Sequence, residues 1–234
     1  MKIALLGYGK MGKVIEQIAM DRGHDVVLKI DKNDKSYDIS QADVAIDFSV
    51  PSAAVVNISM ALNNNVPVIS GTTGWLDQFE KIRNLCKKTN GSFLYASNFS
   101  LGVNLFFELN KVLAKIITPF EDYNVQIEEI HHTQKQDAPS GTAITLAEGI
   151  ADVSNYKGWT LSPENEPNKI EIEAKRIENV PGTHKINYGS EIDSIEIIHT
   201  AHNRNGFGLG AVVAAEWIVG KKGMFTMKDV LNIK

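Results

Sequence analysis

A dense group of proton-transferring and anion-binding side chains occupies residues 128–145, EEIHHTQKQDAPSGTAIT. His131 and His132 are candidate general acids, because imidazole titrates near neutral pH. Lys135 could supply a second positive contact or a proton, and Asp137 could fix the turn or orient Lys135. Neighbouring residues on a strand face opposite sides, so we expect the two histidines not to face the same ligand unless the strand ends there.

The segment Pro139-Ser140-Gly141-Thr142 predicts the start of a helix, with Ser140 as its N-cap. The amides of Gly141 and Thr142, together with the Thr142 hydroxyl, would bind a carboxylate, because a helix N-terminus favours anions. Taken singly, these residues are more often structural: histidines can end a strand, and PSGT can merely begin a helix. Their joint occurrence predicts a substrate site.

The histidines could alternatively bind a metal ion. The sequence contains no HExxH or CxxC spacing, and its single cysteine, Cys86, is distant from them. We therefore predict no metal site, having considered His131, His132, His184, His199 and His202.

A GxGxxG motif at residues 7–12 points to a nucleotide. The motif alone is weak, and a plain glycine turn is the alternative, but here an apolar run precedes it and a helical pattern follows. Asp31, after the next apolar run, would accept from the adenosine ribose, whereas Lys32 and Lys35 could pair with a 2′-phosphate. NADH and NADPH both remain open. The expected contacts are Gly7, Gly9, Lys10, Met11, Gly12, Asp31 and Lys32.

Two further segments, 71–74 (GTTG) and 96–100 (ASNFS), follow later apolar runs. In a doubly wound sheet, ligands bind beyond the carboxyl ends of the strands. GTTG could instead be an ordinary helix N-cap. The expected cofactor contacts are Gly71, Thr72, Thr73, Ser97, Asn98 and Phe99.

The patterns that must position these residues change near residue 100. Before it, short apolar runs alternate with helical patterns, which predicts a Rossmann-type, doubly wound parallel sheet. After it, a helix over 101–117 and several alternating runs predict an α+β domain with a mostly antiparallel sheet. The expected strands are 2–8, 25–31, 44–49, 66–71, 92–98, 123–133, 170–180, 183–191 and 194–202, with 155–169 as a loop and helices in 208–222 and 225–231.

Composition limits the remaining possibilities. The 234 residues carry a formal net charge of -4, which argues against nucleic-acid binding. One cysteine cannot form a disulfide framework, and no signal peptide or membrane span is visible. We expect a cytoplasmic protein with a small-molecule substrate and without nucleic-acid or membrane partners.

The run EEIHHTQKQDAPSGTAITLAEGI closely resembles the signature of the bacterial dihydrodipicolinate reductases, the 4-hydroxy-tetrahydrodipicolinate reductases of lysine and diaminopimelate biosynthesis. The resemblance also covers IALLGYGKMG, IDFSVPSA, ISGTTGW, ASNFSLGVN, VPGTH and IEIIHTAHNRNGFGLGAVVAAEWIVGKKGMFTMKDVL. It implies an oxidoreductase that uses NADH or NADPH to reduce the dihydrodipicolinate imine to tetrahydrodipicolinate.

The resemblance also implies residue roles and a domain layout. His131 matches the acid/base histidine, His132 and Lys135 match substrate-contacting partners, and Arg204 matches an arginine near the interdomain hinge. We also expect Lys135 to take part in catalysis and Ser140 to contact the substrate. The cofactor domain would span 1–101, completed by 205–234, and the substrate domain 102–204 would form a homotetramer through its sheet.

The chain departs from the family pattern at Thr133 and Gln134, where many members carry a basic residue and a histidine. The segment 31–43 is also short, which leaves cofactor preference open. Rival interpretations are an aspartate or homoserine dehydrogenase, which lacks HHxxKxDAPSGTA, and a nucleotide-sensing repressor, which would need a basic recognition helix.

Overall fold

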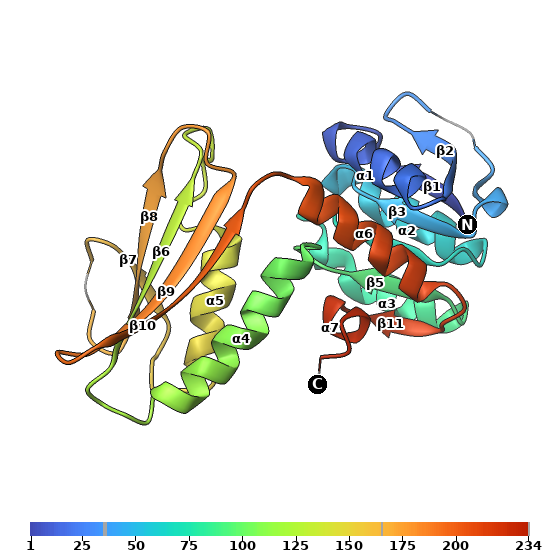
Figure 1. Ribbon diagram of the computed structural model, residues 1–234. Helices are drawn as coiled ribbons and strands as arrows, with labels where there is room; N and C mark the ends of the chain where they lie inside the picture. Colours follow the sequence, from blue (N-terminus) through green and yellow to red (C-terminus); the bar gives the residue numbers. More distant parts are fainter. Residues whose placement is uncertain (35–36, 165, 234) are drawn as a thin grey trace. The chain divides into compact units, whose positions relative to one another are not determined.

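The protein is described here by a computed structural model covering residues 1–34, 37–164 and 166–233, and it divides into two compact units (Figure 1). Unit 1 comprises Met1–Asn104 and Asn205–Lys234, and unit 2 comprises Leu105–Arg204. The first boundary lies inside a helix, three residues beyond the one expected from the sequence. The second coincides with the expected one.

Unit 1 contains a six-stranded, fully parallel sheet with the order β11-β5-β4-β3-β1-β2. Because β1 has β2 on one side and β3 on the other, the chain reverses direction across the sheet at β1, where such folds bind ligands. The strands are β1 (Lys2–Leu6), β2 (Asp25–Ile30), β3 (Val44–Asp47), β4 (Val68–Ser70), β5 (Ser92–Tyr95) and β11 (Gly223–Phe225).

Helices cover both faces of this sheet, which explains why its strands are apolar without alternation. One hydrophobic cluster joins the sheet to α2 (Pro51–Asn63) and α3 (Phe79–Lys88). The other joins it to α1 (Lys10–Asp21), α6 (Asn205–Ile218) and α7 (Met227–Val230). Two short 3₁₀ segments, Ile39–Gln41 and Leu76–Gln78, complete the connections.

Unit 2 packs two helices against one face of a five-stranded sheet with the order β10-β9-β6-β8-β7 (Figure 1). Buried and exposed residues alternate along β6 and β9, as expected for a sheet covered on one face. The elements are α4 (Leu101–Ile117), β6 (Asn124–His131), α5 (Gly141–Ala151), β7 (Trp159–Leu161), β8 (Ile170–Arg176), β9 (Gly182–Gly189) and β10 (Ser194–Ala201).

The second sheet is mixed: the antiparallel pairing was expected, and it is joined by parallel pairing that was not. β6 pairs antiparallel with β9, and β9 with β10, but β6 pairs parallel with β8, and β8 with β7. The parallel pairing follows from α5. This helix returns the chain from the last residue of β6 to the end of the sheet where β6 began, so the next strands run in the same direction as β6. Alternation of buried residues is the same in either direction and therefore does not distinguish them.

Two short strands were also missed. β7 lies in the segment expected to be a polar loop, and β11 takes Phe225 from the segment expected to be helical. Each has only three residues, too few for a periodic signal. Among the described residues, no helix is both long and apolar enough to cross a membrane.

Candidate functional site

The junction between β6 and α5 positions the predicted substrate residues. β6 ends at His131, and His132 begins a turn in which the Lys135 amide donates to the His132 carbonyl at 3.1 Å. The strand therefore ends between the two histidines. Glu129 and His131, two residues apart, both point to the buried face.

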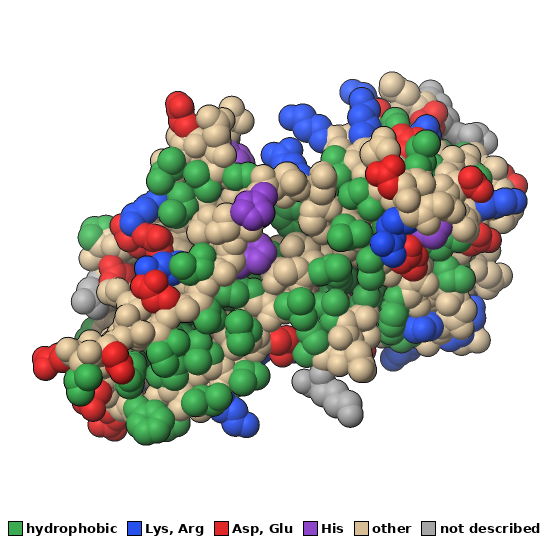
Figure 2. Space-filling model, in the orientation of Figure 1, with side chains coloured by type: hydrophobic (Ala, Val, Ile, Leu, Met, Phe, Trp, Pro, Cys, Tyr) green, Lys and Arg blue, Asp and Glu red, His purple; other side chains and the backbone are tan. Residues whose placement is uncertain are grey.

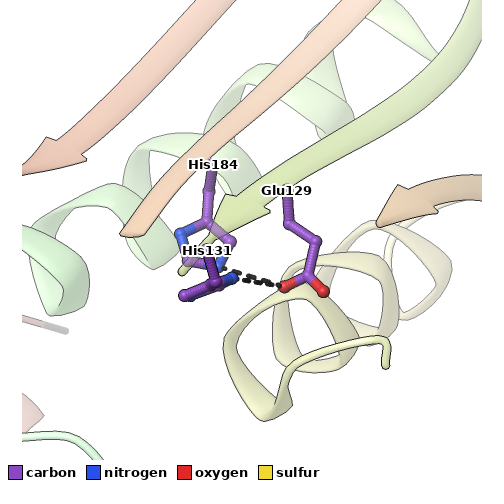
Figure 3. A group of neighbouring side chains, drawn as sticks. All are labelled: Glu129, His131 and His184. Atoms are coloured by element: carbon purple, nitrogen blue, oxygen red, sulfur yellow. Dashed lines mark ion pairs between the residues drawn. The ribbon is translucent and has the colours of Figure 1, made fainter. Parts of the chain in front are cut away.

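Glu129 is the centre of a buried polar cluster (Figure 3). Its side chain is 0% exposed, and its Oε1 accepts from Arg176 Nη2 and from the Ser140 amide, both at 3.0 Å. Its Oε2 lies 3.2 Å from His131 Nδ1 and 3.8 Å from His184 Nε2. Among the described residues, neither Oε2 nor His131 Nδ1 makes a well-angled hydrogen bond. One carboxylate oxygen is thus anchored while the other faces two imidazole rings.

The cluster keeps its carboxylate charged and one imidazole neutral. Burial opposes ionisation of Glu129, but the adjacent His131 imidazole and the hydrogen bonds from Ser140 and Arg176 outweigh it and lower its pKa to about 2. Burial and the neighbouring His131 lower the pKa of His184 to about 3. At neutral pH Glu129 is therefore an anion and His184 is uncharged.

Ser140 links this cluster to the start of α5. As the N-cap, its Oγ accepts from the Ala143 amide at 3.2 Å, and it also lies 3.2 Å from His184 Nε2. The predicted N-cap is confirmed, and its hydroxyl is engaged within the protein. The amides of Gly141 and Thr142 precede the first intrahelical bond, from Ile144 to Ser140. They are therefore not satisfied by the helix itself.

Gly141 is open toward solvent. A Cβ built there would meet nothing within 4 Å, so the fold itself does not require a glycine. Lys135 lies in the turn before it and pairs with both carboxylate oxygens of Asp137 at 2.8 Å. This pairing is the contact expected if Asp137 orients Lys135, and that role stays a prediction. His132 is half-buried, and its Nδ1 has no partner among the described residues.

Glu129, His131 and His184 also have the composition of a metal site, since one ligand atom of each lies within 4.8 Å of the others. The charges around them oppose a divalent cation. Arg176 already neutralises Glu129, and Lys135 adds positive charge to the surroundings of His184. The absence of a metal site stays a prediction.

In unit 1, the glycines of the GxGxxG motif differ in whether the surrounding atoms leave room for a side chain. Gly7 has φ +101° and a Cβ there would lie 2.3 Å from the Phe48 carbonyl oxygen, while a Cβ on Gly12 would lie 2.5 Å from the Gly7 carbonyl oxygen. Gly9, the N-cap of α1, would meet nothing within 4 Å. Gly7 and Gly12 are therefore required by packing, whereas Gly9 leaves room for a ligand to approach the helix N-terminus.

A buried carboxylate at the end of β3 organises the neighbouring loops. Asp47 is 0% exposed and accepts hydrogen bonds from Ser49, Asn57, Ser70 and Thr72. Burial raises the pKa of Asp47 despite these donors. The Thr72 hydroxyl also accepts from the Ser49 amide at 2.8 Å. It is thus engaged within the protein, and a Thr72 contact to a cofactor would have to come from its backbone.

The other predicted cofactor residues follow the carboxyl ends of strands in unit 1, except Arg204, which is exposed in the connection between β10 and α6. Phe99 is buried with its ring 5.5 Å from that of Phe48, so only its backbone is available to a ligand. Lys35 lies outside the described residues. The exposed or half-exposed positions are Lys10, Met11, Asp31, Lys32, Gly71, Thr73, Ser97 and Asn98.

Sequence reasoning missed the partners that hold the site residues. Arg176 and Asp47 were not considered, Glu129 was seen only as an acid in the opening run, and His184 only as a possible metal ligand. Arg176 lies opposite His131, and His184 opposite Glu129, through the pairing of β6 with β8 and β9. No pattern within a single segment shows which residues of two distant strands lie opposite each other. For Asp47, the one signal was an acid within an otherwise apolar strand.

Comparisons with known proteins cover nearly the whole chain. Residues 1–99 match the family model for the dihydrodipicolinate reductase N-terminus and residues 102–231 that for its C-terminus. A 4-hydroxy-tetrahydrodipicolinate reductase from Christiangramia forsetii is 58% identical over 99% of this chain and 98% of its own length. One from Thermosipho africanus is 35% identical over the same shares. A solved dipicolinate-bound dihydrodipicolinate reductase from Paenisporosarcina sp. TG-14 superposes with a TM-score of 0.79, covering 96% of this chain and 97% of its own, at 24% identity.

Proposed function

The chain belongs to the dihydrodipicolinate reductase family, and from this membership we propose that it reduces the cyclic imine derived from 4-hydroxy-tetrahydrodipicolinate to tetrahydrodipicolinate. This step lies in lysine and diaminopimelate biosynthesis. The observation that carries the proposal is His131, held beside the open start of α5, in a chain so similar to a curated reductase.

The substrate is a small dicarboxylate. The solved relative from Paenisporosarcina binds dipicolinate, a planar ring with two carboxylates. In this chain, we assign one carboxylate to the amides of Gly141 and Thr142, where the helix N-terminus offers positive potential. His132 and Lys135 supply positive contacts beside it. This local supply explains how a protein of net charge -4 binds a dianion.

The reaction requires one hydride and one proton. A reduced nicotinamide supplies the hydride, which adds to one carbon of the conjugated C=C–C=N system. The neighbouring position then gains a proton, and we assign its delivery to His131, since histidine is the most frequent general acid in enzymes. Lys135 supplies either a fixed positive charge or a second proton source.

The cofactor is a nicotinamide dinucleotide, and we propose that the protein accepts both NADH and NADPH. Asp31 is exposed at the end of β2, where its carboxylate can accept from a ribose hydroxyl. Lys32 is exposed next to it and can pair with a 2′-phosphate. The proposed contacts are Gly7, Gly9, Lys10, Met11, Gly12, Asp31, Lys32, Gly71, Thr72, Thr73, Ser97, Asn98, Phe99 and Arg204.

We also propose that unit 2 mediates a homotetramer. β10 is an eight-residue edge strand, and unpaired edges of this length favour pairing with another chain. Hydrophobic side chains gather over α4 and β10 (Figure 2). The exposed ones are Leu105, Leu109, Val112, Ile116 and Phe120 in and after α4, and Ile195 and Ile198 in β10. Light scattering at several concentrations tests this, and a monomer throughout would refute it.

Turnover with freshly prepared substrate tests the proposed activity. The purified protein is mixed with NADH or NADPH, and the absorbance of the reduced nicotinamide is followed with and without substrate. We expect a substrate-dependent loss of absorbance with both cofactors. No loss with either would refute the activity, and loss with only one would refute dual cofactor use.

A further inference from the structure

Four separate elements hold Glu129 in place. It lies on β6, its Oε1 accepts from Arg176 on β8 and from the amide of Ser140 at the start of α5, and its register partner His184 lies on β9. Oε1 thus has two donors, and the charge on Oε2 faces His131. The carboxylate is oriented as well as buried.

Compared with apolar residues in the same space, a buried ion of this kind gives the fold little extra stability. Removing a charge from water costs several kcal/mol, and a buried ion pair often contributes no more than apolar residues of equal volume. An arrangement of this cost is expected where the charge acts on a neighbour. The neighbour with an unsatisfied atom is His131, because its Nδ1 is buried 3.2 Å from Oε2.

The His131 ring is confined on its other sides. The His184 ring stands nearly perpendicular to it, with centroids 5.1 Å apart. A Cβ on Gly182 would lie 3.1 Å from His131 Nε2, so the missing side chain leaves space for that atom. His184 does not compete for the role, because it is uncharged and its Nε2 faces the Ser140 hydroxyl.

We propose that Glu129 is a positioning residue for His131: it holds the imidazole hydrogen on Nδ1, so that Nε2 is the atom that exchanges a proton with the substrate. This inference rests on the proposed acid role of His131. A carboxylate at Nδ1 fixes the tautomer and favours the imidazolium form in the same way in other His–carboxylate pairs. Arg176 and the Ser140 amide keep the carboxylate aimed.

Other charged groups near the pair are accounted for. Lys135 is paired with Asp137, His184 is neutral, and His199 on β10 lies opposite His184 with its pKa lowered by burial. Arg176 is fixed by Glu129 and by the carbonyl oxygens of neighbouring residues. A change in the pH dependence of turnover on removing the Glu129 charge would therefore report the Glu129–His131 pair.

Nitrogen-15 NMR of the histidine side chains tests the tautomer without turnover. The signals of His131 are identified by their loss in His131→Gln. In the wild-type protein at high pH we expect its hydrogen on Nδ1. In Glu129→Gln we expect that preference to disappear. A wild-type ring with its hydrogen mainly on Nε2 would overturn the proposal, and this measurement remains decisive if Glu129→Gln fails to fold.

Kinetics provide the second readout. Glu129→Gln should lower kcat by about 10- to 10⁴-fold, the range seen when a histidine loses its carboxylate partner, with KM for substrate and cofactor nearly unchanged. The alkaline limb of its kcat profile should move to lower pH, because the imidazolium loses its anion. Glu129→Asp, which keeps the charge, should retain the wild-type limb.

Glu128→Gln is the matched control, since the adjacent side chain points to the opposite face and pairs with Lys175. It should leave kcat and the pH profile unchanged. If Glu129→Gln matches Glu128→Gln in its profile, the positioning role is wrong. If His131→Gln instead turns over at the wild-type rate, the acid role of His131 is wrong, while the NMR result still decides the tautomer.

Discussion

Replacing Glu129 with glutamine also measures how strongly its charge stabilises unit 2. Burial opposes ionisation, but the adjacent His131 imidazole and the hydrogen bonds from Ser140 and Arg176 outweigh it, so that the pKa falls from 4.5 to about 2. One pKa unit corresponds to about 1.4 kcal/mol, so the ionised side chain stabilises the fold by about 3 kcal/mol relative to an uncharged one. The side chain is 0% exposed, so solvent screens little of this.

The sign of the pH dependence follows from the lowered pKa. The stabilisation is complete above the unfolded-state pKa of 4.5 and is lost as the pH falls toward 2. Glutamine imitates the protonated form, so the free-energy gap between wild type and Glu129→Gln should be about 3 kcal/mol at neutral pH and about 2 kcal/mol near pH 3.5. Below that pH the gap should continue to close.

Hydrogen–deuterium exchange read on peptides from β6 and β9 measures this gap within unit 2, without assuming that the whole chain unfolds in one step. Rates are corrected for the intrinsic pH dependence of exchange. Glu128→Gln, which removes a partly exposed ion pair, should cost at most about 1 kcal/mol. A gap for Glu129→Gln that is equal at both pH values, or below about 0.5 kcal/mol at neutral pH, would refute the reasoning.

Three further predictions concern the two sites. Gly9→Ala should change the free energy of unfolding by less than about 0.5 kcal/mol yet weaken NADH binding, whereas Gly12→Ala should lower the free energy of unfolding by about 1–3 kcal/mol through overpacking. Thermal melts measure the stability and fluorescence titration measures the NADH affinity. Equal destabilisation by the two variants would contradict the steric distinction. His131→Gln should lower kcat by about 10²- to 10⁴-fold with NADH affinity retained, and an unchanged kcat in steady-state assays would remove His131 from the acid role. Dialysis against a chelator should leave activity unchanged, and elemental analysis should find no stoichiometric zinc. Inhibition that zinc reverses would contradict the prediction that the protein has no metal site.

Features set by neighbouring residues in the sequence were predictable. The GxGxxG motif predicted the β1–α1 turn, because glycines and a helix start are local signals. Ser140 predicted the start of α5 for the same reason, because an N-cap residue is a local signal. The apolar runs predicted the parallel sheet of unit 1, since a strand covered on both faces has no polar face.

Features that depend on pairing between distant strands were not predictable. Arg176 meets Glu129 because β8 lies parallel to β6, and His184 meets it because β9 lies antiparallel. An alternating pattern of buried and exposed residues shows neither which strand a segment pairs with nor whether the two strands run parallel or antiparallel. The division of labour between His131 and His132 likewise depended on where β6 ends, which the alternation left open.

Transfer of isotopic label tests the central claim most directly. The protein is supplied with freshly prepared 4-hydroxy-tetrahydrodipicolinate and with NADH deuterated at both C4 positions, and the product is examined by mass spectrometry. The account predicts tetrahydrodipicolinate carrying a single deuterium on a ring carbon. Product without deuterium, or deuterated cofactor left unconsumed in the presence of substrate, would contradict it.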